Sequence, residues 1–533
     1  MVDQPDKRTK DCQSDNVPQS DVTGRDRITR NVLASWGGYG VFIVAGFIMP
    51  RLIDTRIGQE ALGVWDFAWS LVAYFSLVQA GVVSSVNRFV AKYQAVGDLD
   101  GVNRAVSSVS CVLLIMGIVV LGLTVSATLA VPRLLSNQLA GYVGDAKWLV
   151  FLLGVSLAVQ IAFSGFGGVI TGCHRWDLHN YIDAGSYAAT VAGMIAVLSF
   201  GGGLPGLALM NLCGQVAGRA VRCVLAYRVF PGLHVRLAYA HWSDARRMIA
   251  FGGKSFVHSM TELLLNQTTN ILILAYLGPA SLAVYARPRA LVRHVTTLVR
   301  KYAYVLGPTA SSLHAVGQKQ ELGSLLTQGT RYAAYIALPM ILVLAILGGP
   351  ILHLWMGSHY EHGPLLAILA VGYFGTIIQE SVLAVLWGMN LHGRPGLAKL
   401  AAGLCVIAMV IVMLGPLRLG LIATAIAVTV PLTIVNGVYV PIYACHRTGL
   451  SVRQYLRDAM QGPVLCAIPF GLSLVGVRIV FAGNPLVTLA YGGLVGGVVL
   501  ALLYWKYVLP SGLKIRLTRR LSLLRSSRCA KPM

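Results

Sequence analysis

The sequence predicts an all-α integral membrane protein of about 14 transmembrane helices, with two pseudo-symmetric six-helix lobes around a central cleft and two further C-terminal helices. Three observations lead to this prediction. Hydrophobic residues make up 56% of the 533 residues and charged residues only 12%, whereas about a quarter of a soluble domain is charged. Apolar stretches long enough to cross a bilayer recur along the chain. A sequence pattern also repeats at an offset of 220 residues.

The apolar stretches set the predicted helix count. A bilayer core about 30 Å thick is crossed by roughly 20 residues of apolar helix. The segments that meet this length are 31–53, 62–86, 105–131, 148–170, 181–200, 204–227, 254–277, 288–310, 332–354, 365–387, 399–416, 419–444, 463–481 and 485–508. Because the ten-residue alternating pattern of an outer-membrane barrel is absent from the sequence, helices are expected to cross the membrane.

The positive charge follows the predicted topology. The net charge is +23, and most lysines and arginines fall in the tails and loops that an even number of spans places on one side. This asymmetry indicates a multi-pass protein of the bacterial inner (plasma) membrane with both termini in the cytoplasm. Attraction to anionic membrane lipids accounts for the basic C-terminal tail. No nucleic-acid partner is expected, because no nucleic-acid-binding module accompanies the charge. The first 30 residues lack the apolar core of a cleavable signal peptide.

The internal repeat predicts the lobes. Residues 57–71 read IGQEALGVWDFAWSL and residues 277–291 read LGPASLAVYARPRAL. The same register aligns 95–97 with 315–317. Six predicted spans separate the copies, which indicates a parallel repeat about an axis along the membrane normal; the alternative is two merely similar external loops. The predicted domains are a disordered cytoplasmic tail (1–27), an N-lobe (28–230), a C-lobe (231–446), two further helices (447–510) and a basic tail (511–533).

The eighth predicted span carries a basic stripe. Arg289, Arg293, Thr296 and Arg300 follow helical spacing and share one face, while Lys301 is turned about 100° away. Cations at membrane depth are costly and mark a cavity, a partner or a substrate. One interpretation is a cationic cavity for phosphate, since the planar guanidinium suits oxyanions.

The other interpretation of the stripe is structural. Arg300 lies about 18 Å along its helix, and an acid on a neighbouring helix, Glu262 or Glu380, could neutralise it. Arg51 and Arg88 lie at ends of helices that should line the cleft, where both could also reach the membrane surface. The candidate substrate-binding cations are Arg293, Arg300, Lys254, Arg51, Arg88 and Lys301.

The acidic residues are candidates for ion coupling. Glu262 shares a polar face of the seventh predicted span with Lys254, His258, Asn266 and Thr269. The candidates for coupling to a proton or sodium gradient are Glu262, Glu380 and Asp66. Asp66 and Asp183 lie near helix ends, where a solvated interfacial role is the alternative. Arg219 and Arg222 are expected to anchor their helix near the cytoplasmic surface. No other cofactor and no metal is expected.

Enzymatic motifs do not appear in the sequence. HExxH, GxSxG and Walker patterns are missing. The glycine-rich run at 165–172, GFGGVITG, lies in an apolar segment and predicts close helix packing. The chain is therefore expected to be a transporter and no enzyme.

Three motifs resemble one family. The first, at 63–108, reads GVWDFAWSLVAYFSLVQAGVVSSVNRFVAKYQAVGDLDGVNRAVSS; the second, at 168–183, reads GVITGCHRWDLHNYID; and the third, at 266–286, reads NQTTNILILAYLGPASLAVYA. They resemble bacterial polysaccharide-transport proteins, the lipid-linked oligosaccharide (O-antigen-type) flippases of the multidrug/oligosaccharidyl-lipid/polysaccharide exporter superfamily. The likeness covers about residues 30–445. The residues of the first motif that carry it are Gly63, Trp65, Gly81, Arg88, Gly97 and Asp98.

The resemblance implies a function. Such proteins pass a polyprenyl-diphosphate-linked oligosaccharide from the inner to the outer leaflet by alternating access, and a polysaccharide polymerase and a chain-length regulator are implied partners. Thr269 stands where the family usually carries an aspartate. The alternatives are a multidrug/cation antiporter of the same fold and a cell-wall lipid precursor flippase. A membrane glycan polymerase or ligase is an alternative of a different class, although it would need a larger external loop.

Overall fold

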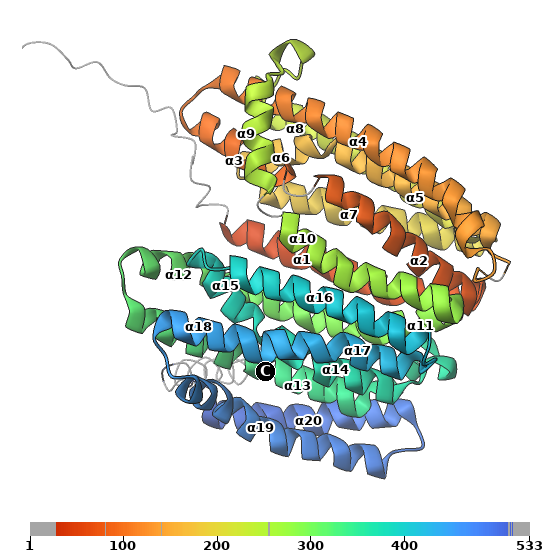
Figure 1. The fold of residues 1–533 in the computed structure, drawn as a ribbon, viewed down its shortest axis with the longest axis vertical. Coiled ribbons are helices and arrows are strands. Elements are labelled where there is room, and N and C mark those ends of the chain that lie inside the picture. Colours follow the sequence, from red (N-terminus) through yellow and green to blue (C-terminus); the bar gives the residue numbers. More distant parts are fainter. Residues whose placement is uncertain are drawn as a thin grey trace, which may run out of the picture.

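The computed structural model describes residues 28–79, 82–139, 141–253 and 256–509, together with positions 512 and 514. The regular structure of this described part is helical throughout (Figure 1). Five short non-α elements are 3₁₀- or π-helices: η2 (Ser76–Gln79), η3 (Leu237–Tyr239), η4 (Leu264–Thr268), η5 (Ser358–Tyr360) and η6 (Ile434–Tyr439).

The α-helices fall into two consecutive sets. The first set is α1 (Ile28–Arg56), α2 (Gln59–Phe75), α3 (Val82–Ala95), α4 (Leu99–Leu135), α5 (Val143–Ala162), α6 (Ser164–Gly172), α7 (Trp176–Ser199), α8 (Gly203–Val229) and α9 (Trp242–Gly253). The second set is α10 (Phe256–Leu263), α11 (Thr269–Ala303), α12 (Leu306–Ala315), α13 (Lys319–Met356), α14 (Gly363–Ile378), α15 (Glu380–Gly388), α16 (Gly393–Leu414), α17 (Gly420–Thr433), α18 (Val440–Thr448), α19 (Val452–Val480) and α20 (Pro485–Tyr507).

The described helices confirm a multi-pass membrane protein. Twelve stretches are long and apolar enough to cross a membrane. One of them, Met260–Ala315, contains two of the predicted spans, because Gly278 with φ 82° interrupts the helix inside α11. Helix α8 matches a predicted span in length but is not among the twelve, since polar residues and arginines interrupt it. The count of fourteen stays a prediction.

The two sets repeat the same backbone features. Gly58 and Gly278, aligned by the repeat, have φ values of 117° and 82°, which favour glycine. The next turns also match: Gly97 and Gly317 have φ values of 72° and 74°, and their N–H groups donate to the carbonyls three residues earlier. The helices that follow, α4 and α13, contain 37 and 38 residues. The described structure thus contains two copies of one helical arrangement.

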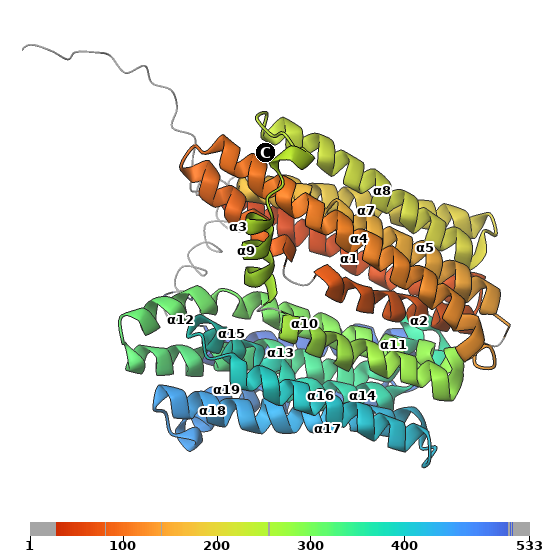
Figure 2. The same cartoon turned by 45° about the horizontal axis from the view of Figure 1, so that its top comes forward.

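These copies form two lobes in space. Figures 1 and 2 show α3 to α9 grouped on one side and α12 to α18 on the other. In Figure 1, α19 and α20 lie along the outer edge of the second group. Helix α1 packs against α7, and α19 packs against α13. We refer to the first group together with α1 and α2 as the N-lobe, and to the second group together with α10 and α11 as the C-lobe. The exact domain boundaries drawn from the sequence stay predictions.

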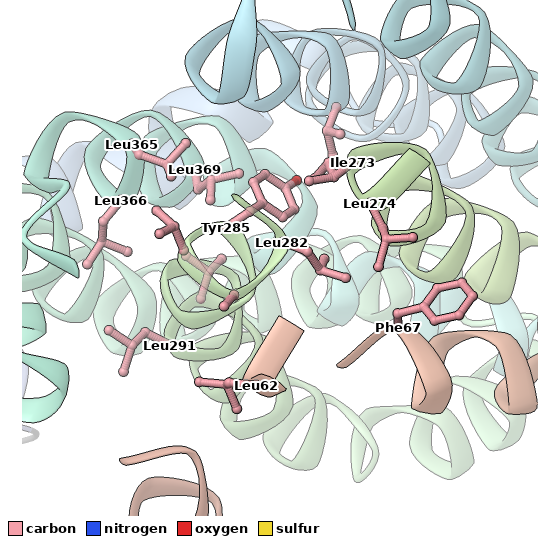
Figure 3. Close-up of a cluster of buried hydrophobic side chains, with 14 of the residues drawn as sticks. Leu62, Phe67, Ile273, Leu274, Leu282, Tyr285, Leu291, Leu365, Leu366 and Leu369 are labelled. Atoms are coloured by element: carbon pink, nitrogen blue, oxygen red, sulfur yellow. The ribbon is translucent and has the colours of Figure 1, made fainter. Parts of the chain in front are cut away.

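Apolar packing joins the lobes where α2 crosses α11. Leu62 and Phe67 of α2 belong to the same buried cluster as Leu274, Leu282 and other residues of α11 and α14 (Figure 3). The backbones approach so closely here that a Cβ added to Gly63 would overlap the Pro279 carbonyl. This contact positions the two copies of the repeat on opposite sides of a shared space.

The glycines of α6 pack against α3, as the sequence predicts. A Cβ added to Gly168 would lie 2.6 Å from Val86, and one added to Gly172 would lie 2.7 Å from Val90. Contacts this short require glycine, because only glycine lets the helices approach so closely. The run at 165–172 therefore holds a wall of the N-lobe in place.

Candidate functional site

Three neighbouring cavities run from one lobe to the other. The N-lobe cavity, about 900 Å³, lies between α3, α5, α6, α7 and α8; the interlobe cavity, about 570 Å³, lies between α1, α2 and α11; the C-lobe cavity, about 180 Å³, lies between α11, α14 and α16. Phe42 and Tyr187 line the first two, whereas Asn266, Arg289 and Arg293 line the last two. The predicted arginine stripe therefore borders the cavities at the centre of the molecule.

Arg287 precedes the stripe and Arg289 begins it, and both arginines have partners. Arg287 is buried and donates to the carboxylate of Asp66 on α2, so that this ion pair joins the lobes. Arg289 donates to the Asn266 side-chain oxygen and, at 3.1 Å, to the Tyr285 hydroxyl. These neutral acceptors orient the Arg289 guanidinium without removing its charge.

Arg293 is an exposed cation of the stripe. Its side chain lines both the interlobe and the C-lobe cavity. Among the described residues, no carboxylate forms an ion pair with the Arg293 guanidinium and no side chain hydrogen-bonds to that group; the Thr297 hydroxyl donates only to the Arg293 backbone carbonyl. A guanidinium in this setting retains its donors for an anion that enters the cavity.

Arg300 has acidic partners. Its Nε donates to Glu380 Oε2 at 3.0 Å and its Nη2 to Glu380 Oε1 at 2.9 Å. Glu262 lies 4.0 Å from the same guanidinium and also forms an ion pair with Lys399. We call Glu262, Lys399, Arg300 and Glu380 the charge quartet. The interpretation in which an acid on a neighbouring helix neutralises Arg300 therefore holds, although the Arg300 side chain is still 49% exposed.

Sequence reasoning missed Lys399. It placed the start of the eleventh span at this residue, where a lysine would extend to the surface. Helix α16 instead begins at Gly393, so Lys399 lies more than one turn inside it and is buried. The signal available in the sequence was the carboxylate of Glu262 in an apolar helix, since such a group requires a cation nearby.

The other predicted cations are scattered. Arg51 lies at the end of α1, with its guanidinium close to Gly357. Arg88 is exposed on α3. Lys301 stacks on Tyr39 of α1, with 3.7 Å from its Nζ to the ring centroid. None of these three lines the cavities named above. Lys254 lies outside the described residues.

Arg219 and Arg222 were expected to be surface anchors, and this expectation is wrong. Both line the N-lobe cavity. Arg222 is buried and pairs with Asp183, whose other oxygen lies 3.3 Å from His179 Nε2. Arg219 donates to Gln215 at 3.3 Å. The prediction failed because α7 places Asp183 beside α8, which gives Arg222 an acid within the protein.

The arrangement brings unpaired positive charge to the interlobe cavity. Arg289 and Arg293 present two positive groups to the interlobe cavity, while Arg287 is neutralised by Asp66. Phosphate and diphosphate oxygens are good acceptors for such guanidinium groups. Of the predicted ion-coupling residues, Glu262 and Glu380 lie together in the charge quartet, whereas Asp66 is separate and pairs across the lobes.

Sequence comparisons connect the chain with polysaccharide synthesis. The model of the polysaccharide biosynthesis protein family matches residues 99–363. The membrane protein EpsK of Bacillus subtilis (strain 168) is 20% identical over 83% of this chain and 88% of its own length. A Shigella flexneri protein named as an O-antigen transporter is 20% identical over 64% of this chain and 80% of its own.

Solved structures share the fold. An inward-facing multidrug resistance MATE family transporter of the MOP superfamily aligns with a TM-score of 0.64 and 14% identity, over 77% of this chain and 95% of that one. The lipid II flippase MurJ in an inward closed conformation aligns with a TM-score of 0.59 and 12% identity, over 88% and 99%. These neighbours confirm the fold class predicted from the sequence.

Proposed function

Because the chain belongs to the polysaccharide biosynthesis protein family, we propose that it moves a polyprenyl-diphosphate-linked oligosaccharide across the inner membrane by alternating access. The Shigella flexneri relative is named as a transporter and the structural neighbours as a transporter and a flippase, which supports a transport role for this chain and no enzymatic role. The finer proposal concerns the substrate: a lipid carrying a diphosphate and a short glycan.

One observation supports this substrate above the others. Arg293 borders two cavities at membrane depth without a carboxylate partner among the described residues, and Arg289 is held beside it by neutral groups. A cation antiporter would require unpaired acids at this place. A diphosphate provides the negative charge that makes guanidinium groups at membrane depth tolerable.

The contacts between the lobes support a cleft that opens toward one side. Trp355 Nε1 donates to the Phe47 carbonyl at 2.7 Å, and the Tyr360 hydroxyl donates to Asp54 at 2.7 Å. Both acceptors lie in the last ten residues of α1, which the positive-inside asymmetry would place in the outer half of the membrane. The N-lobe cavity lies toward the opposite end, where α7 begins. The proposed cycle separates these outer contacts and closes the inner ones.

The energy source and the partners are further parts of the proposal. The charge quartet contains two acids and two bases, and Glu262 reaches both Arg300 and Lys399. A proton or sodium ion that neutralised Glu262 would break its ion pairs with Arg300 and Lys399. Binding of the ion would in this way be coupled to a rearrangement of the cavity charges. The proposal places both termini in the cytoplasm, on the basis of the topology. It includes a polysaccharide polymerase and a chain-length regulator as partners, on the basis of the family.

The experiment that tests the proposal is Arg293→Gln in the cell that carries this chain. We expect surface polysaccharide to fall at least about tenfold, the effect of losing one charged hydrogen bond of about 1.5–3 kcal/mol to the substrate. Lipid-linked oligosaccharide should accumulate on the cytoplasmic face while the protein remains in the membrane. Arg133→Gln, at an exposed position near the end of α4, is the matched control. Unchanged surface glycan in the Arg293 variant would reject the assignment.

A further inference from the structure

The N-lobe cavity differs in chemistry from the interlobe cavity. Its polar lining consists mainly of amides and hydroxyls, among them Asn87, Gln160, Gln215, Ser186 and Thr190. Amides both donate and accept hydrogen bonds, as hydroxyl groups do. Such a lining suits a ligand that carries many hydroxyl groups, whereas guanidinium groups suit a diphosphate.

Several of these polar groups have no partner in the protein. The side chains of Asn87 and Gln160 are half-buried and form no hydrogen bond with another described residue. Gln79 Oε1, His179 Nδ1 and Arg222 Nε are buried and also lack partners in the described part of the chain. Arg222 itself is only 4% exposed. Buried polar groups without partners cost about 1–3 kcal/mol each, so that a ligand or water is expected to satisfy them.

Charges in this cavity are largely compensated. Arg222 pairs with Asp183, and His179 lies beside the same carboxylate. Arg219 contacts the neutral Gln215 and is the remaining cation among the described lining residues. The N-lobe cavity therefore attracts a doubly charged diphosphate less strongly than the interlobe cavity, where Arg289 and Arg293 lie together.

Aromatic rings complete the lining. Trp176 is 42% exposed and borders the cavity from the first turn of α7. Phe42 and Tyr187 stack with ring centroids 4.3 Å apart and border both the N-lobe and the interlobe cavity. Rings with a polar edge or an apolar face bind ligands that have one apolar and one polar side. A sugar ring is such a ligand, because its two faces differ in this way.

We propose that the N-lobe cavity is the sugar subsite of the transporter, in which amides and aromatic rings bind the glycan while its diphosphate lies against Arg289 and Arg293 in the interlobe cavity. This inference rests on the proposed function. The stacked Phe42 and Tyr187 mark the passage between the two subsites, because they line both cavities. The prenyl chain stays in the lipid.

The test measures binding of two probes to the purified full-length protein in lipid nanodiscs. The first probe is lipid-linked oligosaccharide extracted from the cells that carry the chain; the second is the same polyprenyl diphosphate with its sugars removed. In the double variant Asn87→Leu/Gln160→Leu, we expect the Kd for the first probe to rise about tenfold or more and that for the second to stay unchanged. Leucine preserves most of the side-chain volume, so that packing is maintained.

Controls separate this inference from the function on which it rests. Gln328→Leu, on an exposed face of α13, should change neither Kd, and Arg293→Gln should weaken both probes. If the unaltered protein binds neither probe, the proposed function itself fails. If it binds both probes but the double variant binds the sugar-bearing one as tightly as before, the sugar subsite is rejected while the transporter assignment stands.

Discussion

Helix α2 and the part of α11 that follows Gly278 begin alike but present different side chains to the interlobe cavity. Both start after a glycine with positive φ, and Leu62 and Leu282 occupy equivalent buried positions. At the register of the repeat, however, Trp69 and Ala73 of α2 correspond to Arg289 and Arg293 of α11, and all four line the cavity.

The difference separates the residues that maintain the fold from those that give the cavity its chemistry. The shared glycines and leucines build the crossing of the two helices, which any member of such a repeat requires. The arginines appear in one copy only, so the cavity has an aromatic and apolar wall on the N-lobe side and a cationic wall on the C-lobe side. An amphiphilic lipid with a charged head fits a cavity with two unlike walls.

The largest expected effect on stability comes from the ion pair that joins these two helices. Asp66→Asn leaves the buried Arg287 without its carboxylate. Breaking a buried pair in this way costs about 3–5 kcal/mol, which should appear as a lowered Tm of the purified protein. Arg287→Met added to Asp66→Asn should restore most of the loss.

A matched control for this pair lies on the same helix. Glu60→Gln, at an exposed position in the first turn of α2, should leave Tm nearly unchanged. An Asp66→Asn protein as stable as the unaltered one would show that Asp66 is free to act in ion coupling and does not hold the lobes together.

The next largest effect on stability is expected where the two copies of the repeat approach each other, at Gly63 of α2 and Pro279 of α11. Gly63→Ala places a methyl group where the Pro279 backbone lies, and overpacking of this kind costs about 1–3 kcal/mol. Thermal unfolding would measure it against Gly122→Ala in α4, where a Cβ meets open space. Equal Tm values for the two variants would mean that α2 and α11 are not held in this contact.

The smallest effect is expected at the far end of the same α11 segment. Lys301 stacks on Trp36 and Tyr39 of α1, while the residue aligned with it by the repeat is Gly81. Lys301→Met should lower stability by about 0.5–1 kcal/mol, the usual contribution of a cation–π contact. Tyr39→Leu should give a similar loss, and the double variant should lose less than the sum. Additive losses would show that the ring contact contributes nothing.

The sequence predicted the helices, the membrane and the repeat from patterns that are local or periodic. Apolar length identifies a span because an unpaired backbone is not tolerated in lipid. The repeat that aligns Gly58 with Gly278 was visible in the sequence, and both glycines adopt a positive φ that few other residues adopt. The arginine stripe followed from helical spacing alone, and the family resemblance from short motifs.

The tertiary structure decided which charges are paired. Arg300 meets Glu380 across 80 residues, Glu262 meets Lys399 across 137, and Asp66 meets Arg287 across 221. The sequence offered Arg300 two acids and no means of choosing, because the rotation and depth of each helix are set by packing against its neighbours. The same packing buried Arg222 beside Asp183 and left Arg293 without a paired acid in the described part of the chain. Charge in a membrane protein acquires its role from its neighbours, since the cost of an unpaired ion depends on what lies within a few ångströms of it.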